Sequence, residues 1–361
     1  MRIALLVPTL EIGGVERVFA NLANGLHQCG AEVDLVVGRA GGNMGMVLEK
    51  EIQIFDLESD HMMRSVPRVA NYLRARKPEA MICAMTHCCA AAVVARGIAR
   101  QKTKIVATEH NTMSKIVANT TGFKYRFMPL WSRWALNAAD SIVAVSRGVA
   151  DDLSAQTGIP REKFRVIYNP VITDALHSAA TKTVEHPWFQ PGEPPVILAV
   201  GRLDKQKDFP MLVRAFRQVI NRRPARLMIL GEGSDRNRIE QAVDDAGLAN
   251  DVALPGFEQN PYRFMNRAAA FASSSQWEGF GVALVEALAL GVPVVSTSCT
   301  HGPAEILCDG KFGALVPVGD HEAMAQALLT ALNSPVQRDS STHLQQFTVR
   351  SVASNYLSLV N

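Results

Sequence analysis

Short apolar runs alternate with amphipathic segments along most of this chain of 361 residues. In the amphipathic segments apolar side chains recur every three to four residues, which predicts helices, whereas the short runs are almost continuously apolar. Strands of that kind are typical of parallel sheets that helices cover on both faces. The pattern therefore predicts an α/β fold built on parallel sheets.

The predicted elements fall into two groups, one in each half of the chain. Strands are predicted at Ile3–Val7, Val33–Val37, Ile52–Phe55, Ala80–Ala84, Lys104–Thr108, Ser141–Val145 and Phe164–Ile167, and again at Val196–Val200, Arg226–Leu230, Asp251–Leu254, Ala268–Ala272, Val292–Ser296 and Ala314–Val316. Helices are predicted at Glu16–Leu26, Val66–Arg76, Ala90–Arg100, Arg147–Gln156, Phe209–Asn221, Arg236–Ala246, Ala283–Leu290, His321–Leu332 and Val349–Leu359.

The alternation is interrupted between residues 173 and 195, a polar stretch that contains four prolines. Such a stretch is typical of a linker, and the length of the chain also favours two domains over one. We therefore predict two doubly wound, Rossmann-like domains at residues 1–175 and 196–341, joined by a linker at residues 176–195. We expect the domains to face a central cleft, because open parallel sheets bind ligands at the carboxyl ends of their strands.

The composition excludes several classes of protein. The net charge of +3 is too small to indicate nucleic-acid binding. Lys and Arg outnumber Asp and Glu by 21 to 16 in residues 1–180, which favours an anionic partner for the first half of the chain. The six cysteines show no paired spacing, as expected of reduced thiols in a cytoplasmic protein. No signal peptide and no apolar run of membrane-spanning length is present, so we expect a cytoplasmic location.

The segment at residues 273–286 combines two acids with a glycine-containing turn. Glu278 lies in the turn that follows an apolar strand, and Glu286 lies eight positions later within an apolar helix pattern. Glycines allow backbone N–H groups to approach a ligand closely, and the start of a helix adds a partial positive charge. We expect two carboxylates of different exposure beside an anion pocket, which suits a phosphate-linked ligand rich in hydroxyls. The alternative is an ordinary strand–loop–helix with two solvated glutamates.

Cations and glycines follow other predicted strands of the second domain. Arg202 and Lys207 bracket the loop after its first strand, and two cations near a helix start can neutralise a diphosphate. The turns that contain Gly231 and Phe257 follow the next two strands and could hold a nucleotide base through backbone bonds and a stacked ring. Taken singly, each feature also occurs in ordinary surface loops.

Two features of the first domain occupy comparable places. The turn Gly13-Gly14 follows the first strand and opens a helix, which is compatible with a phosphate but also with close packing alone. His110 stands at the end of a strand, from which it could reach a sugar hydroxyl or a developing charge.

Residues 121–134 mix cations with aromatic side chains. Such a mixture suits the surface of an anionic membrane, where amphipathic rings and cations are both stabilised. A helix whose aromatic side chains pack into the first domain explains the same pattern, and the sequence does not decide between the two.

Taken in order, ten motifs across essentially the whole chain resemble those of retaining glycosyltransferase family 4, which has the GT-B fold. The motifs are Gly13-Gly14-x-Glu16-Arg17, Glu109-His110-Asn111, Val145-Ser146-Arg147, Tyr168-Asn169-Pro170-Val171, Gly201-Arg202-Leu203 with Lys207, Gly231-Glu232-Gly233, Leu254-Pro255-Gly256-Phe257, Glu278-x7-Glu286, Gly302-Pro303-Ala304-Glu305-Ile306 and Gly313-Ala314-Leu315-Val316-Pro317. The resemblance also implies that a C-terminal helix, at residues 342–361, crosses back to the first domain.

The resemblance implies roles for individual residues. Arg202 and Lys207 would bind the donor diphosphate, Glu286 the ribose hydroxyls, and Glu278 would face the donor sugar. Gly14 would approach the pyrophosphate, and His110 would lie near the sugar or the acceptor. The backbone amides that would contact the donor are those of Phe280, Gly281, Val282 and Ala283.

By the same resemblance, the protein would be a retaining glycosyltransferase that moves a sugar from a nucleoside-diphosphate sugar, with UDP the common choice. The acceptor would be a glycan or a lipid-linked oligosaccharide of a bacterial surface polysaccharide. No Asp-x-Asp motif is present, so neither a metal nor another cofactor is expected. The alternatives are a nucleotide-sugar epimerase of the same fold and a catalytically silent binding scaffold.

Overall fold

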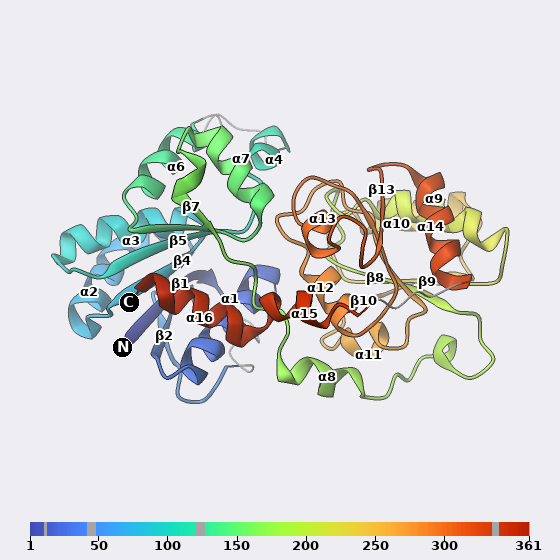
Figure 1. The fold of residues 1–361 in the computed structure, drawn as a ribbon, viewed down its shortest axis with the longest axis horizontal. Helices are drawn as coiled ribbons and strands as arrows, with labels where there is room; N and C mark the ends of the chain where they lie inside the picture. Colours follow the sequence, from blue (N-terminus) through green and yellow to red (C-terminus); the bar gives the residue numbers. More distant parts are fainter. Residues whose placement is uncertain (11–12, 42–47, 120–126, 334–338, 361) are drawn as a thin grey trace. The chain divides into compact units, whose positions relative to one another are not determined.

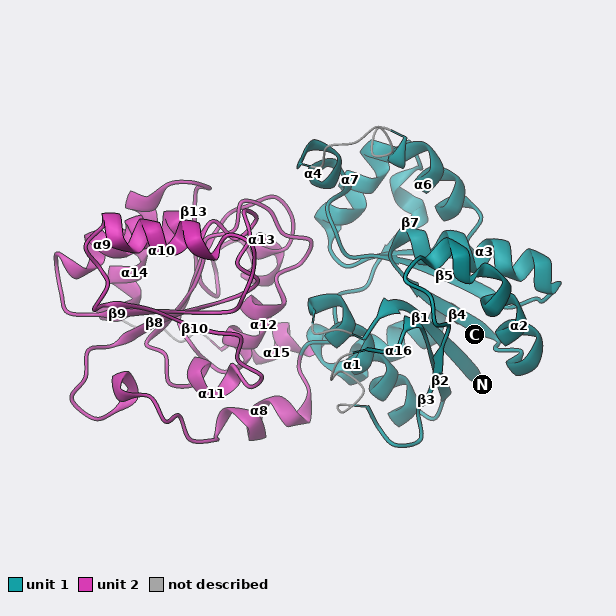
Figure 2. Ribbon diagram, turned by 180° about the vertical axis from the view of Figure 1, so that it is seen from behind, with its two compact units in different colours: residues 1–171, 346–361 teal, residues 172–345 magenta. Residues whose placement is uncertain are grey.

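A computed structural model describes residues 1–10, 13–41, 48–119, 127–333 and 339–360. The chain forms two compact units, shown in different colours in Figure 2. Unit 1 contains residues 1–171 and 346–361, and unit 2 contains residues 172–345. Both chain ends therefore belong to unit 1.

Unit 1 is built on a seven-stranded parallel sheet with the strand order β3-β2-β1-β4-β5-β6-β7. Its central strand, Ala80–Ala84, is apolar throughout and all five of its residues are buried, as expected of a strand covered on both faces. In chain order the strands are β1 (Arg2–Thr9), β2 (Glu32–Arg39), β3 (Gln53–Asp56), β4 (Ala80–Ala84), β5 (Lys104–Glu109), β6 (Ser141–Ala144) and β7 (Phe164–Val166).

Two layers of helices cover this sheet (Figure 1). The helices α1 and α16 pack together on one face, and α2, α3, α6 and α7 follow one another on the other face. The helices of unit 1 are α1 (Gly14–Gln28), α2 (Val66–Arg76), α3 (Met85–Ala99), α4 (Met113–Asn119), α6 (Met128–Asn137), α7 (Arg147–Thr157) and α16 (Val349–Val360).

The last helix, α16, returns to the first unit, as the resemblance implied. A Cβ atom on Gly25 of α1 would lie 2.5 Å from Cγ1 of Val349 and 3.1 Å from Cβ of Ala353. A glycine at this position therefore lets the two helices approach closely.

Unit 2 repeats the architecture with a six-stranded parallel sheet in the order β10-β9-β8-β11-β12-β13. The strands are β8 (Val196–Val200), β9 (Arg226–Leu230), β10 (Val252–Gly256), β11 (Ala270–Ser273), β12 (Val294–Thr297) and β13 (Ala314–Val316). The helices are α8 (Asp174–Ala180), α9 (Phe209–Ile220), α10 (Arg236–Asp245), α11 (Tyr262–Met265), α12 (Val282–Ala289), α13 (Pro303–Ile306), α14 (His321–Asn333) and α15 (Ser341–Leu344). The predicted fold class, two parallel-sheet α/β domains, is confirmed.

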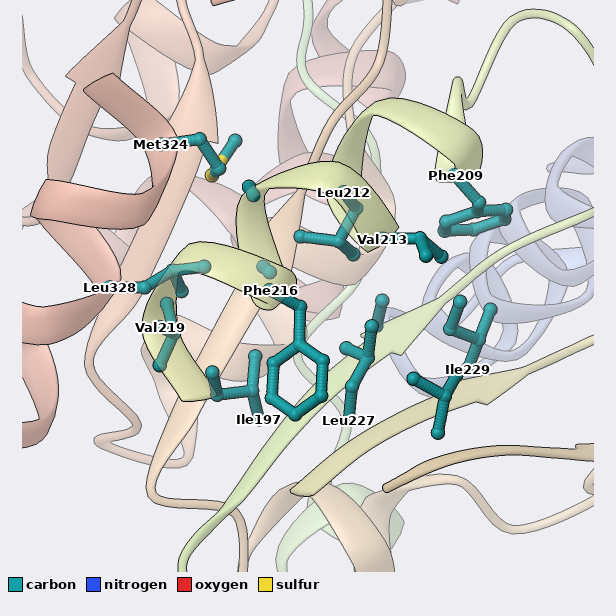
Figure 3. Close-up of a cluster of buried hydrophobic side chains, with 14 of the residues drawn as sticks. Ile197, Phe209, Leu212, Val213, Phe216, Val219, Leu227, Ile229, Met324 and Leu328 are labelled. Atoms are coloured by element: carbon teal, nitrogen blue, oxygen red, sulfur yellow. The ribbon is translucent and has the colours of Figure 1, made fainter. Parts of the chain in front are cut away.

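The core of unit 2 shows why α9 forms where it does. Phe209, Leu212, Phe216 and Val219 of this helix are buried at helical spacing. They face Leu227 of β9 and neighbouring apolar residues of the sheet (Figure 3). Burial of a side chain as large as these stabilises the fold by about 1.5–3 kcal/mol.

The segment at residues 176–195, for which the sequence predicts a linker, lies within unit 2. It begins inside α8, and its backbone carbonyls accept hydrogen bonds from the region of α11. Asn260 Nδ2 donates to the carbonyl of Ala179 at 2.9 Å, and Arg263 Nη1 donates to that of Thr183 at 3.1 Å. These contacts between distant parts of the chain attach the proline-rich segment to unit 2.

One helix boundary differs clearly from the prediction. The sequence predicts that the helix after β4 starts at Ala90, but this helix, α3, begins at Met85. The carboxylate of Glu109 accepts hydrogen bonds from the backbone N–H and the hydroxyl of Thr86, which satisfies donors in the first turn of α3. The capping group comes from another strand, so periodicity along the helix does not reveal it.

Candidate functional site

Three turns at the carboxyl ends of β8, β9 and β10 pack directly against one another. The amide of Gly201 donates to the carbonyl of Leu230, and the amide of Gly231 donates to the carbonyl of Gly256. A Cβ atom on Gly231, which has a φ of 147°, would lie only 1.9 Å from the carbonyl oxygen of Gly201. The glycines of these motifs are therefore required for close backbone approach, which sets the position of the loop that carries Lys207.

Lys207 and Glu278 come together at the end of the sheet. Nζ of Lys207 lies 2.5 Å from Oε1 of Glu278, and the hydroxyl of Ser275 donates to the same carboxylate oxygen at 2.7 Å. The amide of Gln206 contributes a longer contact of 3.4 Å to Oε2 of Glu278. The structure thus brings one predicted cation and one predicted acid into a single ion pair.

The second acid, Glu286, lies in the middle of α12, and its Oε1 accepts a hydrogen bond from the hydroxyl of Tyr262 at 2.9 Å. Its exposed fraction is 4%, and that of Glu278 is 6%. The expectation that the two carboxylates differ in exposure is therefore wrong. Both are buried, because partners from other elements surround them.

Two glycines shape the turn between the two acids, Gly281 within it and Gly302 in a turn that packs against it. Gly281 precedes α12 with a φ of 107°, a left-handed conformation that places the amides of Val282 and Ala283 in the first turn of the helix. A Cβ atom on Gly302 would lie 1.9 Å from the carbonyl oxygen of buried Phe280. The conformation of Gly281 and the close approach of Gly302 therefore set the position of residues 280–283, whose amides are predicted to contact the donor.

A small cavity of about 20 Å³ lies beside this cluster, lined among others by Lys207, Ser275, Glu278 and Ala283. A cavity of this size holds about one water molecule, so a larger ligand would have to bind on its outer side or displace side chains. Within the part of the chain that the structure describes, no group of three or more His, Cys, Asp or Glu side chains is placed to hold a metal ion.

The remaining predicted donor residues of unit 2 lie at the same edge of the sheet. The side chain of Arg202 is 75% exposed and is paired with Asp204 at 2.7 Å. Phe257 follows β10 directly, and its ring is also exposed. Both side chains are therefore accessible to a ligand.

In unit 1, Gly14 is the first residue of α1, and a Cβ atom there would meet no atom within 4 Å. His110 directly follows β5, where Nε2 lies 3.0 Å from the hydroxyl oxygen of Thr108. Because that hydroxyl donates to the carbonyl of Cys83, its oxygen is available to accept from the Nε2–H of a neutral imidazole. Burial lowers the pKa of His110 to about 4, partly opposed by the side chain of Asn169.

This depressed pKa predicts a pH-dependent stability of unit 1. Above pH 6.5 the imidazole is neutral in both states, but between about pH 6.5 and 4 the unfolded chain binds a proton that the folded chain does not. The free energy of unfolding therefore falls by about 3 kcal/mol as the pH drops from above 6.5 to below 4, since each pKa unit corresponds to roughly 1.4 kcal/mol. We expect denaturant unfolding at pH 7 and 4.5 to show a smaller pH-dependent loss in His110→Gln than in the wild type.

The matched control is His61→Gln, because His61 is an exposed histidine of the same unit. It is expected to retain the wild-type pH dependence. An equal loss in the wild type and in His110→Gln would contradict a buried neutral imidazole.

Sequence patterns did not identify three neighbours of the acids, Gln206, Ser275 and Tyr262. Each contacts a glutamate through one side-chain group, and Gln206 and Tyr262 lie 72 and 24 positions from the acid that they contact. The serine run before Trp277 is a weak signal for Ser275. Tyr262 carries no signal, because α11 is separated from Glu286 by 24 positions.

Two family patterns match the two halves of the chain. Residues 12–175 match Glycosyltransferase Family 4, and residues 182–346 match Glycosyl transferases group 1. The chain belongs to the glycosyltransferases that join these two domains in the GT-B fold.

Several relatives show this similarity. The chain is 32% identical over 235 residues to the N-acetylgalactosamine-N,N'-diacetylbacillosaminyl-diphospho-undecaprenol 4-alpha-N-acetylgalactosaminyltransferase of Campylobacter jejuni, a match that covers 64% of this chain and 61% of that enzyme's length. It is 28% identical to the lipopolysaccharide core biosynthesis glycosyltransferase LpsE of Rhizobium meliloti over 96% of both chains. Among solved structures, Anabaena Alr3699/HepE in complex with UDP-glucose superposes with a TM-score of 0.82 at 20% identity, covering 99% of each chain.

Proposed function

We propose that this protein transfers a sugar from a nucleoside-diphosphate sugar to a hydroxyl of a glycan or lipid-linked acceptor, in the assembly of a bacterial surface polysaccharide such as lipopolysaccharide. The observation that carries the proposal is the contact between Lys207 and Glu278 at the end of the unit 2 sheet, where the glycine turns pack together. Glu286 lies on α12, the helix that follows the turn of Glu278. UDP is the nucleotide we expect, since UDP and UDP-glucose are the ligands named for HepE. The names of the two bacterial relatives support an acceptor of this class.

In this proposal the loop that follows β8 in unit 2 binds the donor diphosphate through Arg202 and Lys207. These fixed cations stabilise the negative charge that develops on the leaving diphosphate, which is the largest single contribution to catalysis in such reactions. Glu286 binds the ribose hydroxyls, and Glu278 faces the donor sugar. The parts assigned to Gly14, His110 and the ring of Phe257 stay predictions.

A thermal-shift screen of UDP-, GDP- and ADP-sugars tests donor binding, because a bound donor raises the melting temperature. Incubation with the stabilising donor and a panel of lipid-linked glycans then tests transfer. Nucleotide release that requires the acceptor supports the transferase. An isomerised sugar nucleotide formed without any acceptor would instead support the epimerase alternative, and donor binding with no turnover would support the scaffold.

We further propose that transfer retains the anomeric configuration and requires no metal. No acidic group is assigned as a nucleophile in this proposal. The bond between the anomeric carbon and the diphosphate oxygen breaks, and the acceptor oxygen bonds to that carbon on the same face. The leaving diphosphate oxygen accepts the acceptor's proton. The proton NMR spectrum of the first product reports the configuration, and transfer after treatment with a chelator reports the metal requirement. An inverted product or a chelator-sensitive rate would contradict these two assignments.

The exposed face of α6 supports docking of unit 1 to an anionic membrane. Ser132, Ala135 and Leu136 of this helix are buried. Its opposite face exposes the apolar side chains of Leu130, Trp131 and Trp134, at helical spacing. Between Glu109 and Asp140 the sequence contains four cations, Lys115, Lys124, Arg126 and Arg133, and no acidic residue.

Rings and aliphatic side chains beside cations suit the surface of an anionic bilayer. The packing explanation for this segment therefore does not hold for the exposed residues of α6, whereas residues 121–126 of the same segment lie outside the described residues. No helix in the described ranges is long and apolar enough to cross a membrane.

We expect the double substitution Leu130→Gln with Trp134→Gln to weaken binding to phosphatidylglycerol vesicles about tenfold or more, because two large apolar contacts are lost. Vesicle flotation measures the bound fraction. Met63→Gln is the control, since Met63 is also an exposed apolar residue of unit 1 but lies outside α6. Equal flotation of the double variant and the wild type would remove α6 from the membrane contact.

A further inference from the structure

Both cations assigned to the donor diphosphate are paired with acids of the protein itself. Arg202 Nε lies 2.7 Å from Asp204 Oδ2 on the exposed side of the loop. The pair formed by Lys207 and Glu278 is much less accessible, and the side chain of Glu278 is buried. The second pair is therefore the one whose breakage changes the energy of ligand binding most.

The carboxylate of Glu278 occupies a well-defined anion position. Oε1 accepts from Nζ of Lys207 at 2.5 Å and from the hydroxyl of Ser275 at 2.7 Å. Ser275 is itself fixed, because its carbonyl accepts a hydrogen bond from the hydroxyl of Thr297 at 2.6 Å. A cation and a neutral donor that converge on one oxygen are also the groups that bind a phosphate oxygen.

We propose that Glu278 holds the place of a donor phosphate oxygen at Lys207 in the ligand-free protein, and that it moves from Lys207 to the donor sugar when the donor binds. This inference rests on the function proposed above, which assigns the diphosphate to Lys207 and the sugar to Glu278. Carboxylate and phosphate compete for the same ammonium group, so the site stays charge-neutral until the ligand arrives.

The exchange distinguishes the donor from the nucleotide product. A nucleoside diphosphate that binds Lys207 displaces the carboxylate of Glu278, which loses its ion pair without gaining hydrogen bonds from a sugar. A nucleoside-diphosphate sugar displaces it too, but the sugar hydroxyls donate hydrogen bonds to the released carboxylate and offset the loss. The pair therefore weakens product binding relative to donor binding and favours product release after transfer.

The test compares the affinity for sugar-free UDP, GDP and ADP in the wild type and in Glu278→Gln, by titration calorimetry. The glutamine has nearly the same size and can still accept from Ser275, but it forms no ion pair with Lys207. We expect the nucleoside diphosphate that the wild type binds best to bind Glu278→Gln about tenfold more tightly, a coupling of ordinary size between competing groups. For the nucleotide sugar that contains the same diphosphate, the affinity for Glu278→Gln is expected to rise by a smaller factor, or to fall.

A second variant keeps the acid and so guards against misfolding of the first. Ser275→Ala removes one donor to the carboxylate of Glu278 and is expected to tighten diphosphate binding by about two- to threefold, since one hydrogen bond contributes little net energy. The control is Glu240→Gln, which removes an exposed ion pair with Arg236 elsewhere in unit 2 and should leave the affinity unchanged.

The outcomes separate this inference from the proposed function. Wild-type binding of a nucleoside diphosphate, with the same affinity in Glu278→Gln and Ser275→Ala, would overturn the exchange and leave the transferase intact. A weaker affinity in Glu278→Gln would overturn it as well, since the carboxylate would then assist diphosphate binding. Absence of any nucleotide or nucleotide-sugar binding to the wild type would remove the proposed function, and the exchange with it.

Discussion

Replacement of Lys207 by Ala is expected to reduce turnover on the order of 10²-fold or more, because removal of one fixed charge at a developing anion has an effect of this size. The side chain of Lys207 lies against Gly201, and its Nζ contacts the carboxylate of Glu278. Arg202→Ala and Glu278→Ala are expected to lower turnover by a similar factor.

Steady-state kinetics with donor and acceptor measure the effect, expressed per folded molecule from a melting curve. Lys205→Ala is the matched control, since Lys205 is an exposed lysine of the same loop, and it should retain nearly full turnover. Near-normal transfer by Lys207→Ala would remove that residue from the phosphate site.

Replacement of Gly231 by Ala is expected to destabilise unit 2 by about 3 kcal/mol, because overpacking and an unfavourable backbone conformation act together. The added Cβ would lie 1.9 Å from the carbonyl oxygen of Gly201, at a φ of 147° that alanine rarely adopts. The turns that follow β8 and β9 must then move apart, which also displaces the loop of Lys207. We therefore expect weaker nucleotide binding together with a lower melting temperature.

Denaturant unfolding monitored for unit 2 measures the loss of stability. Gly192→Ala provides the control, because Gly192 also has a positive φ, of 93°, but a Cβ atom there meets nothing within 4 Å. It should lose only the smaller contribution of backbone strain, about 1 kcal/mol. An equal loss of unfolding free energy in Gly231→Ala and Gly192→Ala would show that the close approach of the turns does not contribute to stability.

The two predicted effects differ in how far the sequence alone supports them. Lys207 was identified by its distance from Gly201 along the chain and by the resemblance that this spacing completes. The requirement for glycine at position 231 was not visible, since a glycine after a strand is common and only the neighbouring turn makes it necessary. The burial of Glu278 was also not visible, because its cationic partner Lys207 lies 71 positions away in the sequence.

The strand pattern was predictable because burial on both faces leaves a continuous apolar run in the inner strands, as in Val196–Val200 and Ala80–Ala84. The start of α3 was predicted wrongly, because Glu109 of another strand contacts its first turn. The contacts of Asn260 and Arg263 with residues 179 and 183 were likewise not visible in the sequence. Such contacts depend on tertiary proximity, which periodicity does not encode.

The sequence by itself determined that two parallel-sheet halves carry glycine turns, cations and two acids after their strands, because these features are local in the chain. Only the tertiary structure decided that Lys207 pairs with Glu278, that Tyr262 bonds to Glu286, and that both acids are buried. The reason is physical: the charge and hydrogen bonding of a carboxylate depend on the groups within a few ångströms. Here the ammonium group of Lys207 is 71 positions from Glu278, and the hydroxyl of Tyr262 is 24 positions from Glu286.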